Sequence, residues 1–298
     1  MWMLFAFVAA VCYGFRGVLY HWTSGRPMNR NLMLCGVFFT GFIVSVAGTL
    51  LTGQVWSYGA WIGILMGTFS FMANASLYKG FAVGKASLVA IITALPPVVV
   101  AIAAYIFWNE ALSVWQLTAL VVIITGVIMI RYSNELSFKN LQGAQWGLLA
   151  MLFFASNDLA TKQSTRLEAD MFPTLCMMFG TGSFLFCVWW LMERRKGTAN
   201  SAAVREEASI NLKSESLPWK ETKTFFWGMI VGTTNISGSI FIMAAFERGV
   251  TGLVSAIVAV NVLIILLYSR LFGKERFSPL QLAGMGFSLL GIVVLRAF

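Results

Sequence analysis

Long apolar stretches separated by short polar segments run along the whole chain of 298 residues. A stretch of about 20 apolar residues is long enough to cross the hydrocarbon core of a bilayer as an α-helix. The strands of a membrane barrel would be shorter and would alternate between apolar and polar positions, which these stretches do not. The pattern predicts an all-α polytopic membrane protein with ten transmembrane helices. The predicted spans are residues 2–21, 32–53, 57–78, 86–108, 113–131, 145–163, 171–192, 224–245, 252–272 and 278–296.

Composition agrees with this pattern, because 58% of the residues are hydrophobic and only 11% are charged. A soluble domain is about half apolar and a quarter charged. No basic segment precedes the apolar run that begins at Trp2, so we expect no removable signal peptide. We expect a multi-pass protein of a bacterial plasma membrane.

Part of the sequence is an internal repeat. Residues 81–131 align without a gap with residues 246–296, and 13 of the 51 aligned positions are identical. Shared apolar composition does not keep polar residues in register, yet Glu110, Ser113, Gln116 and Arg131 recur 165 residues later. We therefore expect a duplicated five-helix unit, with one repeat at residues 1–140 and the second at residues 141–298.

An odd number of helices in each repeat means that the two copies enter the membrane from opposite sides. Two inverted five-helix repeats are a recurrent construction of secondary transporters, where they move about a central binding site and expose it to each side in turn. The repeat therefore points to alternating access. The alternative is a duplication that only built a larger membrane scaffold or receptor without transport.

Several motifs resemble one transporter family. They are a glycine-bearing first span, LYKGFAVGKAS before the fourth span, ALPP within it and NEALSVWQLTALVVIITG after it. In this order, and with the repeat, they are similar to the EamA-like members of the drug/metabolite transporter superfamily. The resemblance implies ten helices and a transporter of small metabolites, often an exporter, that works without ATP. Two positions depart from the pattern: Asn261 aligns with Pro96, and Arg16 lies where the family usually has uncharged residues.

Two charged residues lie near the middle of predicted spans, where charge is costly unless it faces a cavity or a partner. Arg16 lies in CYGFRGVLY and Asp158 in FFASNDLAT, and an offset of 142 between the first and sixth spans makes them equivalent. We expect Arg16 to hold an anionic group or balance charge, and Asp158 to take up a proton or bind a substrate cation. In straight inverted helices the two would lie on opposite sides of the midplane. The alternative is that Arg16 reaches the membrane surface and Asp158 caps a helix end.

Neutral polar residues in the spans indicate a hydrated cavity, because buried amides need hydrogen-bond partners. Contacts between helices are the competing explanation for these residues, and both remain open. Two prolines at the middle of the fourth span remove backbone N–H groups and bend the helix, which makes them a candidate hinge. The candidate substrate-binding or coupling residues are Tyr13, Arg16, Asn74, Asn157, Asp158, Asn235 and Asn261, and the candidate hinge residues are Pro96 and Pro97.

Most basic residues fall on one side of the predicted topology. Lysine and arginine prefer the cytoplasmic side, so their distribution favours both chain ends outside, whereas the resembled family is commonly drawn with both ends inside. The most polar segment, residues 193–223, carries both charge signs and is predicted to be a loop between the seventh and eighth spans.

Enzymatic function is not indicated. The sequence has no phosphate-binding loop, nucleophile elbow or metal-ligand cluster, and a single histidine. We therefore expect no catalytic residues, no metal and no cofactor. The net charge of +9 fits topology and contact with lipid headgroups rather than nucleic-acid binding. The expected partners are a small-molecule substrate, lipids and possible coupling protons, in a monomer or homodimer. A lipid carrier is a further alternative.

Overall fold

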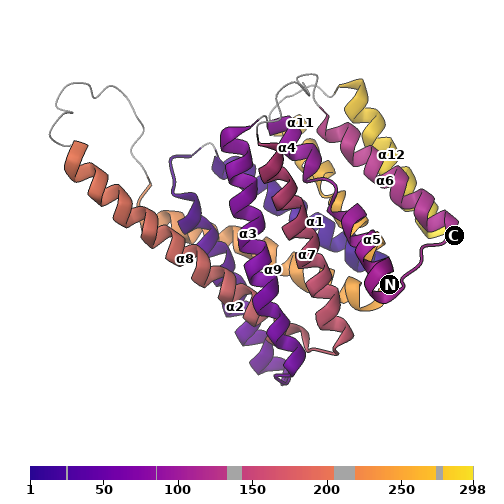
Figure 1. Cartoon of the computed structure of the whole chain (residues 1–298), viewed down its shortest axis with the longest axis horizontal. Coiled ribbons are helices and arrows are strands. Elements are labelled where there is room, and N and C mark those ends of the chain that lie inside the picture. The colour runs from indigo at the N-terminus through magenta and orange to yellow at the C-terminus, as the bar shows by residue number, and fades with distance from the viewer. Residues whose placement is uncertain (25, 85, 133–142, 205–218, 273–277, 298) are drawn as a thin grey trace.

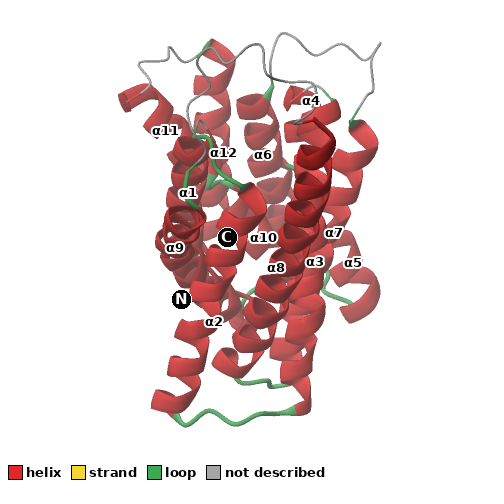
Figure 2. Cartoon of the chain, turned by 90° about the vertical axis from the view of Figure 1, so that its left-hand side faces the viewer, coloured by secondary structure: helices red, strands yellow, loops and turns green. Residues whose placement is uncertain are grey.

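The computed structural model describes residues 1–24, 26–84, 86–132, 143–204, 219–272 and 278–297. Within these ranges the chain is helical, with short turns between helices and without strands (Figure 2). The elements are α1 (Trp2–Ser24), α2 (Arg30–Thr52), the short 3-10 helix η1 (Tyr58–Trp61), α3 (Ile62–Val83), α4 (Ala86–Ile92), α5 (Pro96–Trp108), α6 (Val114–Arg131), α7 (Ala144–Arg166), α8 (Met171–Val204), α9 (Glu221–Arg248), α10 (Thr251–Ala259), α11 (Val262–Phe272) and α12 (Pro279–Ala297).

Helix length and composition place the chain in a membrane. Across the described ranges, nine helical stretches are long and apolar enough to span a bilayer. The remaining predicted span, at residues 145–163, is α7, which carries Asn157, Asp158, Lys162 and Gln163 within its length. Because α7 contacts α3, α4, α5 and α9, these polar residues are carried by a helix inside the bundle. The predicted all-helical membrane protein with ten spans is confirmed.

Two of the spans are broken near their middle. The span predicted at residues 86–108 consists of α4 and α5, separated by residues 93–95, and the one predicted at 252–272 consists of α10 and α11, separated at residues 260–261. Pro96 and Pro97 occupy the first two positions of α5, where their missing N–H groups leave no hydrogen bond unmade. The prolines therefore start a new helix instead of bending one continuous helix.

The polar segment after the seventh span differs from its prediction as a loop. Helix α8 continues through residues 193–204, and α9 already begins at Glu221. Alanine, arginine, lysine and glutamate favour helix, so the polar residues extend α8 beyond the apolar part of the span (Figure 1). Arg194 lies 3.5 Å from Glu221 and connects the two helices. Residues 205–218 of the predicted loop lie outside the described ranges.

The helices cross closely where glycines remove side chains. A Cβ atom at Gly36 of α2 would collide with the Phe225 carbonyl oxygen of α9, and one at Gly228 of α9 would collide with the Met33 carbonyl oxygen. Helices α6 and α12 likewise meet at Gly126 and Gly284. Small residues let membrane helices approach to backbone distance, so these glycines fix the crossing points.

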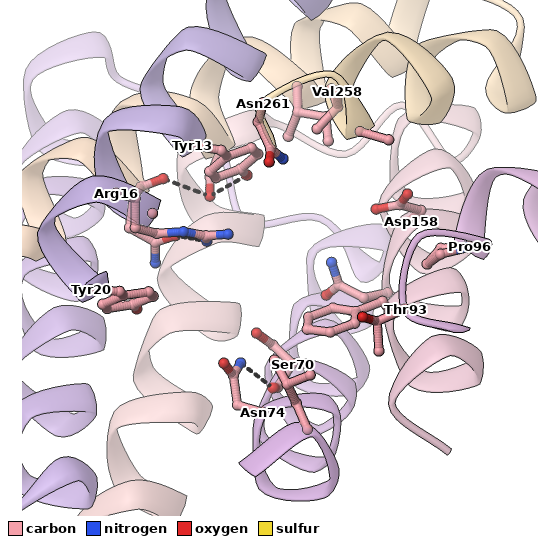
Figure 3. A pocket seen from close by; sticks show the side chains of 18 of the residues that line it. Tyr13, Arg16, Tyr20, Ser70, Asn74, Thr93, Pro96, Asp158, Val258 and Asn261 are labelled. Carbon is pink, nitrogen blue, oxygen red and sulfur yellow. Dashed lines mark hydrogen bonds between the residues drawn. The ribbon is translucent and has the colours of Figure 1, made fainter. Parts of the chain in front are cut away.

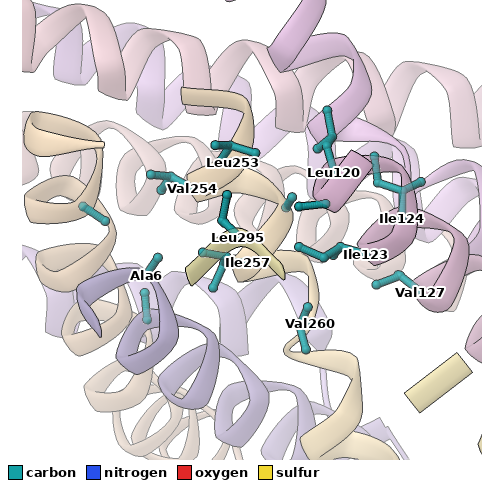
Figure 4. Close-up of a cluster of buried hydrophobic side chains, with 14 of the residues drawn as sticks. Ala6, Leu120, Ile123, Ile124, Val127, Leu253, Val254, Ile257, Val260 and Leu295 are labelled. Carbon is teal, nitrogen blue, oxygen red and sulfur yellow. The ribbon is translucent and has the colours of Figure 1, made fainter. Parts of the chain in front are cut away.

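Helix contacts link the two halves of the chain. Helix α1 packs against α9, α10 and α11, and the corresponding helix of the second half, α7, packs against α3, α4 and α5. Helix α2 packs against α8 and α9, and α3 packs against α8. One hydrophobic cluster joins α1, α6, α9, α10 and α12, as Figure 4 shows with Ile123, Leu253 and Ile257. A second cluster around Phe38, Phe179 and Phe186 joins α2 and α8.

The direction of the helices defines two faces of the bundle. The start of α1 and the end of α12 lie on one face, which we call the terminal face, and both chain ends are close together in Figure 1. The ends of α1, α3 and α6 lie on the other face, which we call the opposite face. The two broken spans enter from different faces, since α4 follows α3 and α10 follows α9.

Candidate functional site

A cavity of about 710 Å³ lies between the two halves of the chain. Its deep end is formed by the helix breaks, where Pro96 and Asn261 line it, together with Asp158 of α7 (Figure 3). From there it extends to the opposite face, where the exposed Arg26 and Arg30 line it. Pockets of about 300–1,000 Å³ hold small organic molecules. The cavity is therefore large enough for a metabolite and reaches one face of the bundle.

The structure brings every candidate residue of the sequence analysis to this cavity, although these residues come from five helices and from the break between α10 and α11. Their location at one cavity is observed in the structure, and their function remains a prediction. The residues that line the cavity and that the sequence analysis singled out are Tyr13, Arg16, Asn74, Pro96, Pro97, Asn157, Asp158, Asn235 and Asn261.

Arg16 lies on the α1 wall and points into the cavity (Figure 3). Its Nη1 atom donates a hydrogen bond of 2.5 Å to Oδ1 of the buried Asn235. The Tyr13 ring covers its guanidinium at 4.4 Å, and the Tyr13 hydroxyl lies 3.2 Å from Oγ of Ser239. A guanidinium has five N–H donors, so this arrangement orients Arg16 and leaves further donors for a ligand. Arg16 does not extend to the membrane surface.

Asp158 lies on the wall across from Arg16 (Figure 3). Its Oδ2 atom accepts a hydrogen bond of 2.6 Å from Oγ of Ser255, a buried residue of α10. Asp158 is inside α7 and does not cap a helix end. Arg16 and Asp158, both within the described residues, form no ion pair with each other. The two charges thus face the same space from opposite halves of the chain.

The break between α4 and α5 is held by a side chain from α6. The Arg131 Nη1 atom donates to the Ala90 carbonyl oxygen at 2.8 Å and lies 3.3 Å from Oγ1 of Thr93. The Ala94 N–H bonds the Ile91 carbonyl oxygen instead of continuing the α-helical pattern to Ala90. Arg131 therefore satisfies a carbonyl group that the helix break leaves without its backbone partner.

The asparagines differ in their partners. Asn74 donates from Nδ2 to the Ser70 carbonyl oxygen of its own helix at 2.7 Å. Asn157 has a fully buried Oδ1 atom that accepts no hydrogen bond from the described residues. Asn261 points toward the cavity beside Tyr13 (Figure 3). An unsatisfied buried amide is costly, so the free acceptor of Asn157 is a suitable place for a substrate group or water.

Hydroxyl groups near the middle of α9 bond within their own helix. Thr233, Thr234 and Ser237 bond carbonyl oxygens of their own helix and do not line the cavity. Asn235 and Ser239 of the same helix do line it. The polar run in α9 thus divides between hydroxyls that bond their own helix and residues that line the cavity.

A buried ion pair lies on the terminal side of the cavity, beyond the lining residues Asp158 and Thr161 of α7. Lys162 of α7 lies 3.5 Å from Glu110, which precedes α6. Its Nζ atom also donates to the carbonyl oxygens of Phe246 and Gly249, at 2.7 and 2.9 Å. Glu110 accepts a hydrogen bond of 2.9 Å from the Thr251 N–H at the start of α10. The Glu110 carboxylate thus accepts a hydrogen bond from the start of α10, in the other half of the chain, and not from the start of α6, the next helix after Glu110.

Three residues that contribute to this region were not predicted from the sequence. Lys162 was not among the predicted candidate residues, but it is only 7% exposed. Its spacing of four residues from Asp158 places both on one face of α7, which was an available signal. Ser255 and Arg131 carry no such signal, because their roles depend on contacts with α7 and with the break between α4 and α5.

A multi-pass helical bundle with a polar cavity between two broken spans is the construction of a membrane transporter. The sequence model of the EamA-like transporter family matches residues 1–132 and again residues 141–297. The chain therefore belongs to the EamA-like transporter family, within the drug/metabolite transporter superfamily. It is an integral, multi-pass membrane protein of a transporter family.

A structural comparison agrees on the fold. The chain superposes on a solved structure titled "Crystal structure of protein" with a TM-score of 0.73, over 98% of this chain and 96% of that chain, at 13% sequence identity. At this identity the likeness shows the fold alone. No curated protein sequence matches the chain.

Proposed function

We propose that the protein is a secondary transporter that moves a small organic metabolite across a bacterial plasma membrane by alternating access. The observation that carries this proposal is a central polar cavity that reaches the opposite face, with the buried pair of Glu110 and Lys162 on its terminal side. A site that is open to one side at a time is what carriers of this kind require. Transport is proton-coupled or facilitative, and export is the direction that we favour.

Contacts between the two halves support an inverted repeat with unequal conformations. In an inverted repeat each helix has a counterpart in the other half, and α7 and α3 are the counterparts of α1 and α9. The contact of α1 with α9 and the contact of α7 with α3 both occur. Helix α10 contacts α5, and a Cβ atom at Gly252 would lie 2.6 Å from Cβ of Ala101. The exchanged pair, α4 and α11, makes no comparable contact among the described residues. The second state would then close α4 against α11 and separate α5 from α10.

The cavity residues have distinct roles in this mechanism. Arg16 binds an anionic group of the substrate through donors that Asn235 does not use. Asp158 takes up a proton or binds a cationic group of the substrate, since it lies on the wall across from Arg16. The breaks at Pro96 and Asn261 let each half of a broken span move separately.

Transport assays in proteoliposomes test the proposal. Cationic, anionic, zwitterionic and neutral metabolites are added to wild type and Asp158→Asn with and without a pH gradient, on a solid-supported membrane and as radiolabelled substrates. We expect pH-driven flux of one substrate class, which Asp158→Asn abolishes if this carboxylate carries the coupling. Glu168→Gln is the control, because Glu168 is an exposed carboxylate outside the cavity.

The assay also separates the alternatives. Flux that is unaffected by Asp158→Asn and by the pH gradient indicates facilitated transport with another role for Asp158. If the folded protein moves no radiolabelled substrate under any gradient, the transporter proposal is wrong and a scaffold or receptor explains the cavity better. Lipid exchange without movement of any water-soluble substrate would indicate the lipid carrier.

A further inference from the structure

The charged residues that line the cavity are strongly unbalanced in sign. Among the described residues of its wall, arginine occurs four times and an acidic residue once, at Asp158. None of these arginines forms an ion pair with a carboxylate of the described residues. The four are Arg16, Arg26, Arg30 and Arg131.

The arginines contact neutral groups instead. Arg16 donates to the Asn235 amide, and Arg131 donates to the carbonyl oxygen at the helix break. At the mouth of the cavity, Arg26 packs over the Trp22 ring at 4.7 Å and Arg30 over the Tyr78 ring at 3.8 Å. These partners orient the guanidinium groups but supply no compensating negative charge.

Membrane topology explains only part of this arrangement. Arginines at the ends of spans also set orientation, which accounts for Arg26 and Arg30 as residues of the opposite face. It does not account for Arg16, which lies within α1 and is half-buried. Asp158 already accepts a hydrogen bond from Ser255 and lies on the far wall. The excess positive charge therefore runs from the mouth to the deep end of the cavity.

The geometry of the guanidinium groups suits an oxyanion. An aromatic ring over the face of a guanidinium leaves its N–H edge exposed, and that edge matches the two oxygens of a carboxylate or phosphate. A cleft lined by one sign of charge between low-dielectric walls also concentrates ligands of the opposite sign. A cation in this cavity would meet four guanidinium groups and a single carboxylate.

We propose that the substrate is a small organic anion, whose carboxylate or phosphate group binds Arg16 at the deep end after Arg26 and Arg30 attract it at the mouth. This inference rests on the transport function proposed above and specifies its substrate class. Arg131 has a positioning role, because its Nη1 atom holds the break between α4 and α5.

Binding to the purified full-length protein tests the substrate class separately from transport. The probes are glutarate, glutamate, glutamine and cadaverine, which share a five-carbon chain and differ in charge, together with inorganic phosphate and glycerol 3-phosphate. We expect the anions to raise Tm and glutamine and cadaverine to have smaller effects or none. High ionic strength should weaken anion binding, because screening acts on charge attraction.

Matched variants locate the binding group. Arg16→Gln should weaken anion binding by about tenfold or more, the size expected for a lost hydrogen bond to a charged group, and Arg16→Lys should keep part of it. Arg26→Gln with Arg30→Gln should mainly slow anion association at low salt. The control is Arg166→Gln, since Arg166 packs over Trp108 in the same way but lies outside the cavity.

The outcomes distinguish the inference from the transport proposal. Anion binding that depends on Arg16 but gives no flux in proteoliposomes would support the substrate class and contradict transport. Faster flux or tighter binding of glutamine or cadaverine than of the anions would overturn the inference. The proposal that the protein is a transporter would still stand. The inference is also wrong if no anion shifts the Tm of the folded wild type, or if Arg166→Gln weakens binding as much as Arg16→Gln does.

Discussion

Lys162 and Glu110 form an ion pair of 3.5 Å whose side chains are only 9% and 17% exposed. The pair connects the end of α7 to the segment between α5 and α6. Hydrogen bonds extend it to the turn between α9 and α10, because Lys162 bonds two carbonyl oxygens there and Glu110 bonds the first N–H of α10. One buried pair thus joins both halves of the chain on the terminal side of the cavity.

Breaking this pair should open the terminal face. Lys162→Met leaves the Glu110 carboxylate buried without its cation, and loss of one member of a buried pair costs about 3–5 kcal/mol. We expect a lower Tm and faster labelling of Ala101→Cys by a membrane-impermeant maleimide, because Ala101 of α5 packs against Gly252 of α10 in this structure and separation of the two helices would expose it. Labelling is measured in a chain whose four native cysteines are replaced by alanine.

Two controls accompany this experiment. Val114→Cys is 78% exposed at the start of α6 and should react at the same rate in both backgrounds. Glu110→Gln combined with Lys162→Met removes both charges and should recover part of the lost stability. Unchanged labelling of Ala101→Cys in Lys162→Met would show that the pair does not keep this face closed.

The hydrogen bond between Ser255 and Asp158 should matter for coupling. Ser255→Ala removes the one described donor to the Asp158 carboxylate, and hydrogen bonds to charged groups contribute about 1.5–3 kcal/mol. We expect the pH profile of flux to change and the rate to fall, while Ser255→Thr keeps a hydroxyl and retains most activity. Flux in proteoliposomes across a pH series measures this. An identical profile for wild type and Ser255→Ala would contradict a coupling role for this hydrogen bond.

The prolines at the start of α5 should keep the broken span broken. With Pro96→Ala and Pro97→Ala together, two backbone N–H groups return and a continuous helix becomes possible. We expect an equal or higher Tm and slower flux, with substrate binding retained, because the halves of the span would no longer move separately. Equilibrium binding and flux are measured on the same preparation. Unchanged flux in the double variant would exclude a hinge at this position.

Close packing of α2 against α9 should make Gly228 intolerant of a side chain. The added Cβ of Gly228→Ala would collide with the Met33 carbonyl oxygen, a backbone atom that cannot turn aside. We expect a loss of about 1–3 kcal/mol of stability, seen as a lower Tm. Gly286→Ala is the matched control, because nothing lies within 4 Å of its added Cβ, and it should leave stability equal or higher. Equal Tm values for the two variants would contradict the described crossing.

Polar residues in the spans were predictable site candidates for a simple reason. An arginine, aspartate or asparagine in a membrane helix must face protein or water, so Arg16, Asp158 and Asn235 were expected in the interior of the bundle. Lys162 was not recognised, since it lies near a helix end, where a basic residue usually marks the membrane surface. Charge and position along the helix do not distinguish a lysine at the membrane surface from a buried one, whereas contacts with neighbouring helices do.

Apolar run length and the repeated segment determined a ten-helix membrane protein, because the cost of exposing backbone groups to lipid makes each such run a helix. They also determined which residues could not face lipid. Only the tertiary structure decided that a new helix starts at Pro96, that the ninth span also breaks, that α8 continues past residue 193, and that Arg16 and Asp158 face each other without pairing. These features depend on contacts between distant helices, and no local pattern encodes which face of a cavity is closed.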